Sequence, residues 1–147
     1  MKVAVCGCLL GHNCKYNGKN NRNEQLLTFL QDKEIFSLCP EAMAMLPIPR
    51  PPIEWLGDRA VDSTGHDYTA EFVLGAQRAM SLVKQIEPEM VILQPRSPSC
   101  GVGQIYDGTF TKTLVPGNGD FAALLLAHGY QISREQLSDK FIILNKS

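Results

Sequence analysis

The stretch PEMVILQPRSPSCG, residues 88–101, decides the predicted fold of this 147-residue chain. Met90 to Leu93 form a continuous apolar run bounded by Pro88 and Pro95, which is the pattern of a central parallel strand covered on both faces. The segment that follows is rich in proline and serine and contains Cys100, as is typical of a loop. We therefore expect a buried strand with a thiol beyond its carboxyl end.

The segments before this strand alternate between strand and helix patterns. Short apolar runs predict strands, and apolar residues at helical spacing predict helices. Asn23 is the expected N-cap of the first helix, and Pro40 ends the second strand. The predicted elements are a first strand at Val3–Cys6, a helix at Glu24–Leu30, a second buried strand at Ile35–Cys39 and a long helix from Thr69 that ends before Pro88.

Two more elements are expected after the central strand. Ile105 to Leu114 predicts a hairpin, in which Asp107-Gly108 suits a two-residue type I′ turn. A helix is expected from about Asp120 to His128, with Gly129 at the C′ position. This order favours an α/β fold, specifically a single-domain, three-layer Rossmann-like sandwich with a mainly parallel sheet and a small hairpin. The length fits one compact domain over residues 1–147.

The composition is that of an ordinary globular protein, with 44% hydrophobic residues, 20% charged residues and a formal net charge of -1. The chain has no excess of basic residues that would indicate binding to nucleic acid. The longest apolar run, Phe121 to Ala127, is far shorter than the roughly 18 residues that a membrane span requires. The first ten residues resemble a signal peptide only faintly and lead to no small-residue cleavage site, so we assign them to the first strand. We expect a cytoplasmic protein without membrane contact.

The cysteines are the most informative residues. They are odd in number and dispersed, and they contain no Cys-x-x-Cys pair. A disulfide framework, a zinc ribbon and a thioredoxin-type site are therefore not indicated, and any metal site must be assembled by the fold. The five cysteines are Cys6, Cys8, Cys14, Cys39 and Cys100.

Three of these thiols occupy equivalent positions in the predicted fold. Cys8 lies just beyond the first strand, Cys39 ends the second, and Cys100 follows the central one. Ligands of open α/β sheets bind outside the carboxyl ends of the strands, so we expect these thiols to meet there. Cys6, inside the first strand, is interpreted as a small buried apolar residue.

Six motifs in one order carry a family resemblance. They are CLLG (8–11), CKYNG (14–18), CPE (39–41), PRPP (49–52), SPSCG (97–101) and YDGTF (106–110). Over about residues 3–135 the chain resembles the thiouracil desulfidase family, formerly a domain of unknown function. The resemblance implies a 4Fe-4S cluster held by Cys8, Cys39 and Cys100, with one iron lacking a protein ligand. The chain departs from the family pattern at Cys6-Gly7, which makes Cys6 a competing ligand.

The expected function is an iron-sulfur-dependent desulfidase. An iron without a protein ligand can act as a Lewis acid toward the soft sulfur of a small thiolated heterocycle such as 2-thiouracil. Sulfur would leave as sulfide and the oxo compound would form by non-redox hydrolysis. Glu41 is the candidate acceptor of water's proton, and Ser97 and Ser99 are candidates for hydrogen bonds to substrate or cluster. Structural alternatives are a helix-dipole role for Glu41 and turn formation for the serines.

Two other functions remain open at this stage. Cys100 could be the nucleophile of a hydrolase or transferase, with oxyanion donors from its glycine-containing loop. Alternatively, Cys14 could join the other three cysteines in a closed four-thiolate site, which would make the chain a non-enzymatic metal- or cluster-binding module. The sequence leaves the oligomeric state and the physiological substrate open.

Overall fold

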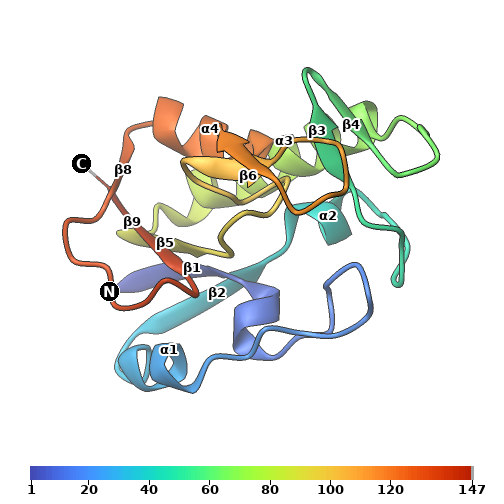
Figure 1. The fold of residues 1–147 in the computed structure, drawn as a ribbon. Coiled ribbons are helices and arrows are strands. Elements are labelled where there is room, and N and C mark those ends of the chain that lie inside the picture. The colour runs from blue at the N-terminus through green and yellow to red at the C-terminus, as the bar shows by residue number, and fades with distance from the viewer. Residues whose placement is uncertain (147) are drawn as a thin grey trace.

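A five-stranded sheet with the order β2-β1-β5-β9-β8 forms the centre of the molecule (Figure 1). The computed structural model describes residues 1–146. The strands in sheet order are β2 (Glu34–Leu38), β1 (Lys2–Cys6), β5 (Met90–Leu93), β9 (Ile142–Lys146) and β8 (Tyr130–Ile132). The predicted strands at residues 3–6 and 90–93 are confirmed, whereas β8 and β9 were not predicted.

The sheet is mixed, so the prediction of a mainly parallel sheet is wrong. β1 is parallel to β2 and to β5, but β9 is antiparallel to both β5 and β8. The parallel strands are joined by crossovers that contain helices, whereas β8 and β9 are joined by a loop, which returns the chain in the opposite direction. The broader α/β class is correct.

Helices flank the sheet, with α3 (Thr69–Ile86) and α4 (Asp120–Ala127) on one side and α1 (Glu24–Phe29) on the other (Figure 1). The Asn23 side chain accepts a hydrogen bond from the Leu26 amide at 3.0 Å, which confirms the predicted N-cap. All three predicted helices are present, with bounds that differ by at most two residues. No helix among residues 1–146 has both the length and the apolar character needed to cross a membrane.

The second strand is less buried than predicted. β2 lies at an edge of the sheet, and Ile35 is 40% exposed. The predicted end at Pro40 is confirmed, because this proline is the first residue of the short helix α2 (Pro40–Met43), where its missing amide proton costs no hydrogen bond.

Two small hairpins lie beside the main sheet: β3 (Glu54–Leu56) with β4 (Arg59–Val61), and β6 (Gln104–Tyr106) with β7 (Leu114–Pro116). The predicted two-residue turn at Asp107-Gly108 is wrong, because Tyr106 pairs with Leu114 and residues 107–113 form a longer loop. This loop packs against β3, where the Gly108 and Phe110 amides donate to Glu54 Oε1.

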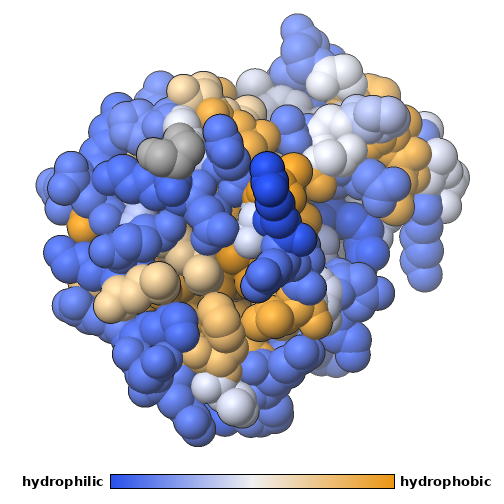
Figure 2. Space-filling view, turned by 90° about the vertical axis from the view of Figure 1, so that its left-hand side faces the viewer, coloured by the Kyte–Doolittle hydropathy of each residue, from blue (hydrophilic) through white to orange (hydrophobic). Residues whose placement is uncertain are grey.

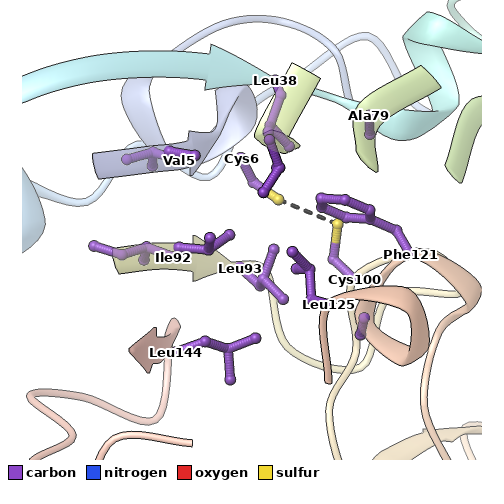
Figure 3. Close-up of a cluster of buried hydrophobic side chains, with 14 of the residues drawn as sticks. Val5, Cys6, Leu38, Ala79, Ile92, Leu93, Cys100, Phe121, Leu125 and Leu144 are labelled. Carbon is purple, nitrogen blue, oxygen red and sulfur yellow. Dashed lines mark hydrogen bonds between the residues drawn. The ribbon is translucent and has the colours of Figure 1, made fainter. Parts of the chain in front are cut away.

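The main core is formed by apolar side chains from the sheet and the helices, with the sulfurs of Cys6 and Cys100 among them (Figure 3). The face of the molecule in Figure 2 is mainly hydrophilic, with apolar side chains in a band across it. This face lies at the side where β1 begins (Figure 1). The core also reaches the opposite edge of the sheet, because it includes Cys8 and Cys100, which lie beyond the carboxyl ends of β1 and β5.

Candidate functional site

The structure brings the strand-end cysteines to one edge of the sheet. Cys8 lies in the 3-10 helix η1 (Gly7–Leu10), directly after β1. Cys39 follows β2 as the N-cap of α2, and Cys100 lies in the loop after β5. Because β1, β2 and β5 are mutually parallel neighbours, their carboxyl ends lie together, as the sequence predicted.

Cys6 contacts this group in addition to packing in the core. Its sulfur lies 3.2 Å from that of Cys100, and both side chains are buried (Figure 3). The sequence-based interpretation of Cys6 as a buried apolar residue is correct as to burial, but it missed this contact, since strand periodicity carries no information about a partner 94 residues away.

Cys14 also joins the group, because Cys39 and Cys8 both lie close enough to shift the pKa of its thiol. It lines a cavity of about 320 Å³ together with Cys39, His12 and Met43. This volume is at the lower end of the range for small-molecule sites. All five thiols are therefore near one another, and an opening to solvent reaches two of them.

The thiols that interact with one another hold their protons. The hydrogen bond to Cys100 and burial raise the pKa of Cys6 well above its usual value. For Cys100, the hydrogen bond with Cys6 lowers the pKa, but burial together with the charges of Cys39 and Glu41 raises it, and the net direction is upward. The hydrogen bond to Cys39 lowers the pKa of Cys14, whereas the bond to Cys8 and burial raise it to about 11. The hydrogen bond to Cys14, followed by burial, raises the pKa of Cys39.

The donor set fits an iron-sulfur cluster better than a single metal ion. Among residues 1–146, no three His, Cys, Asp or Glu side chains are spaced to hold one ion. Thiolates around a cluster of four irons bind different metal atoms and stand farther apart than ligands of one ion. Binding would release the protons that mutual repulsion and burial now keep on the thiols.

Glu41 belongs to a buried polar network beside these thiols. Its Oε1 forms an ion pair with Arg50 Nη2 at 2.9 Å, and its Oε2 accepts a hydrogen bond from the Ser99 hydroxyl at 2.9 Å. The side chains of Arg50 and Glu41 are only 3% and 15% exposed. Arg50 also donates to the carbonyl oxygens of Cys14 and Pro47. Glu41 is thus fixed in orientation by partners from two other segments.

The two serines have different positions in this network. Ser97 Oγ accepts hydrogen bonds from the amides of Ser99 and Cys100 at 3.2 and 3.1 Å, which is the geometry of a serine that shapes a turn. Ser99 Oγ lies 3.1 Å from Ser97 Oγ and 3.7 Å from Cys100 Sγ. The Ser99 hydroxyl therefore connects the Glu41 carboxylate to the Cys100 thiol.

Sequence reasoning missed Asp120, the first residue of α4. Its Oδ2 is buried without a hydrogen-bond partner among the described residues. Burial, together with the charge of Glu41, raises the pKa of its carboxyl to about 7. An acidic residue at the start of a helix is ordinarily interpreted as a dipole partner, so the sequence offered no signal for this burial.

A larger cavity, of about 670 Å³, has no cysteine in its wall. Its wall includes Asn21, whose Nδ2 lies 4.0 Å from Cys8 Sγ. Three basic side chains contribute to the same wall, namely Arg22, Arg96 and Lys140. The cavity therefore comes near Cys8 only through Asn21, and its wall carries the Glu24 carboxylate as well as the basic side chains.

Comparison with known proteins yields a consistent result. A family model described as 2-thiouracil desulfurase matches residues 3–136. The uncharacterized protein YbbK of Bacillus subtilis (strain 168) is 35% identical over 148 residues, which cover 93% of this chain and 98% of that protein. Among solved structures, the [4Fe-4S]-dependent thiouracil desulfidase TudS matches with a TM-score of 0.80 and 37% identity, over 86% of this chain and 85% of that chain.

Proposed function

This chain belongs to the 2-thiouracil desulfurase family, and on that premise we propose that it removes sulfur as sulfide from a thiolated heterocycle such as 2-thiouracil, leaving the oxo compound. It is an iron-sulfur-dependent enzyme, and its cofactor is a 4Fe-4S cluster. The observation that carries the proposal is the meeting of buried thiols with the Glu41–Ser99 hydrogen bond at one edge of the sheet.

We propose Cys8, Cys39 and Cys100 as the cluster ligands, with Cys6 and Cys14 as neighbours that do not bind iron. The support is that the three residues follow three adjacent parallel strands, each as the thiol nearest the strand end outside the sheet. When bound, the cluster supplies an iron without a protein ligand, a Lewis-acid position for a soft thiocarbonyl sulfur.

Glu41 is the proposed acceptor of the proton from the attacking water. Its Oε1 is held by Arg50, and this ion pair keeps the largely buried carboxylate in one orientation. A general base must first be held within hydrogen-bond distance of the proton that it accepts, and its proton affinity is a second requirement. The structural alternative for Glu41 was an interaction with the helix dipole, but α2 has only four residues and its dipole is small. The buried ion pair with Arg50 is the stronger structural interaction of Glu41.

Ser99 is the proposed hydrogen-bond donor to substrate, and Ser97 supports it. The Ser99 hydroxyl has one proton, which it donates to Glu41 in the absence of substrate. If it donated this proton to a bound substrate instead, its oxygen would still lie 3.1 Å from Ser97 Oγ. Ser97 accepts from two backbone amides and thereby fixes the loop that carries both Ser99 and Cys100.

We further propose that residues 1–147 act as one three-layer, Rossmann-like domain that works in the cytoplasm on a small molecule. The support for the location is that five free thiols and an iron-sulfur cluster persist best in a reducing compartment. The sheet edge occupied by the site is the one at which ligands of α/β folds bind.

The test is anaerobic reconstitution followed by assay of sulfide release from 2-thiouracil. We expect the cluster-loaded protein to release sulfide and form uracil, and iron-free protein to be inactive. Equal turnover by iron-free protein would instead favour nucleophilic catalysis by Cys100. The raised pKa of this thiol argues against that alternative, because a cysteine nucleophile acts as the thiolate.

A further inference from the structure

Asn21 makes two polar contacts with Cys8, one through its backbone and one through its side chain. The Asn21 amide donates to the Cys8 carbonyl at 2.9 Å, and Asn21 Nδ2 donates to Cys8 Sγ at 4.0 Å. The same segment is held at a second point, because the Asn23 amide donates to the Leu9 carbonyl at 3.2 Å. The Asn21 side chain is therefore fixed beside a thiol that we propose as a cluster ligand.

Lys15 binds the other end of the Asn21 side chain. Its Nζ donates to Asn21 Oδ1 at 3.0 Å, and both residues are half-buried. An ammonium group can only donate, so this contact assigns the oxygen to Lys15 and leaves the nitrogen for Cys8. Lys15 is itself held in a turn, in which its amide donates to the Lys19 carbonyl at 3.2 Å and its carbonyl accepts from the Gly18 amide at 2.9 Å.

The neighbouring asparagines use their side chains differently. Asn17 Oδ1 accepts from the Lys19 amide and Asn20 Oδ1 from the Arg22 amide, each at 3.0 Å, which is the geometry of an Asx turn. Within residues 1–146, no backbone amide donates to Asn21 Oδ1 in this way. Turn formation therefore accounts for the side chains of Asn17 and Asn20 but not for that of Asn21.

Charge favours donation from Asn21 once Cys8 binds metal. Ligation converts Cys8 from a neutral thiol, which is a weak acceptor, into a negatively charged thiolate, which is a stronger one. Lys15 forms no ion pair with any carboxylate among residues 1–146, so its positive charge acts on Asn21 alone. A cation on the amide oxygen polarises the amide and strengthens its N–H groups as donors.

We propose that Asn21, anchored by Lys15, is a positioning residue that donates an N–H···S hydrogen bond to Cys8 in the cluster-loaded protein and makes the cluster more electron-poor. This inference rests on the proposed function, because it takes Cys8 as a cluster ligand. Hydrogen bonds to the sulfurs help to set the reduction potential of a cluster. A thiolate that shares its charge with the Asn21 amide gives less of it to iron, which increases Lewis acidity toward a thiocarbonyl sulfur.

The first test measures the midpoint potential of the cluster in anaerobically reconstituted, full-length Asn21→Leu, from the electron paramagnetic resonance signal of the reduced state. Leucine removes the donor, but it fills the space between Cys8 and the adjacent cavity and so keeps water from replacing the lost hydrogen bond. We expect the potential to fall by about 59 mV, which is a tenfold change in a one-electron equilibrium. An unchanged potential at full iron content would overturn the proposal.

The matched control is Asn20→Leu. Asn20 is exposed, and its side chain contacts Asn13 and the Arg22 amide rather than a thiol. We expect the potential of this variant to equal that of wild type. Equal shifts in Asn20→Leu and Asn21→Leu would show that a disturbed loop, not the hydrogen bond to Cys8, changes the potential, and the proposal would be overturned.

Asn21→Asp decides the case in which Asn21→Leu binds no iron. Aspartate keeps the size of the side chain and an acceptor for Lys15, but it presents an oxygen to Cys8 in place of the N–H donor. We expect a lower potential than in Asn20→Asp, where the added charge is exposed and screened by solvent and salt. Equal potentials in the two aspartate variants would overturn the proposal.

Sulfide release separates this assignment from the proposed function. We expect turnover of 2-thiouracil by Asn21→Leu to be lower than wild type by about tenfold, within the usual effect of removing an outer partner of a metal ligand. Absence of turnover by fully loaded wild type would overturn the proposed function, while the potentials would still decide the role of Asn21. Normal wild-type turnover with an unchanged potential in Asn21→Leu would overturn the Asn21 assignment alone.

Discussion

Glu41 is the residue at which structure and proposed chemistry are most tightly connected. Its carboxylate binds Arg50 with one oxygen and Ser99 with the other, so any substitution changes a buried ion pair as well as a candidate base. Glutamine keeps an acceptor for both partners but removes the charge and the ability to take a proton. Activity and stability must therefore be measured together.

For Glu41→Gln we expect cluster content close to wild type and a single-turnover rate lower by about 100-fold to 10,000-fold, the usual contribution of a positioned base. The weakened pairing with Arg50 should lower the free energy of unfolding by about 1 to 3 kcal/mol. Glu135→Gln, at an exposed position, is the control and should change neither quantity. A near-normal rate in destabilised Glu41→Gln protein would confine Glu41 to a structural role.

The thiols give a second prediction at the residue scale. After anaerobic reconstitution, alanine at Cys8, Cys39 or Cys100 should abolish iron binding, because a cluster with two ligands is not retained. Alanine at Cys6 or Cys14 should leave iron and acid-labile sulfide close to wild type. Complete iron loss from Cys14→Ala would replace the open site with closed four-thiolate coordination, and loss from Cys6→Ala would make Cys6 a ligand.

At the scale of elements, the joint between α4 and the Ser97–Gly101 loop aligns the site. Gly119 lies so close to this loop that a Cβ atom would overlap the Ser99 carbonyl and come within 2.7 Å of the Cys100 nitrogen. The glycine is thus required by close backbone approach. The loop cannot accommodate an added methyl group without moving Ser99 and Cys100.

Gly119→Ala should therefore lower the free energy of unfolding by about 1 to 3 kcal/mol, as overpacking usually does, and should reduce iron content after reconstitution. Gly117→Ala is the matched control, because an added Cβ there meets only the flexible end of Ile105, at 3.1 Å. Its effects on stability and iron content should be small. Equal effects of the two substitutions would contradict a specific role for the Gly119 contact.

At the scale of the whole molecule, β9 joins the last part of the chain to the central strand. It lies between β5 and β8, and Leu144 is fully buried in the same core as Cys6 and Cys100. The sheet that aligns the thiols therefore depends on residues near the end of the sequence. Loss of β9 packing should weaken the entire fold.

Leu144→Ala should lower the free energy of unfolding by about 2 to 5 kcal/mol, the usual cost of a buried Leu-to-Ala change. Denaturant unfolding of cluster-free protein measures this loss. Ile132→Ala in the edge strand β8 is the control, since Ile132 is 55% exposed and its replacement should change stability by only about 0.5 kcal/mol. Similar losses of unfolding free energy from both variants would show that β9 contributes no more to stability than the edge strand β8.

The sequence by itself determined the helices α1, α3 and α4, the strands β1, β2 and β5, and the placement of Cys8, Cys39 and Cys100 at strand ends. These features follow from local causes: apolar periodicity, the Asn23 cap and the stop at Pro40. The motifs, read as a family resemblance, supplied the cofactor and the reaction. Glu41, Ser97 and Ser99 were proposed from their positions beside the candidate ligands.

Only the tertiary structure decided which distant segments meet. The direction of β9, the contact of Cys6 with Cys100, the pairing of Glu41 with Arg50 and the burial of Asp120 each depend on such a meeting. The physical reason is that periodicity reports which side of an element is buried, but not which partner covers it. Charge, hydrogen bonding and proton affinity depend on that partner, so they are fixed only when the chain is folded.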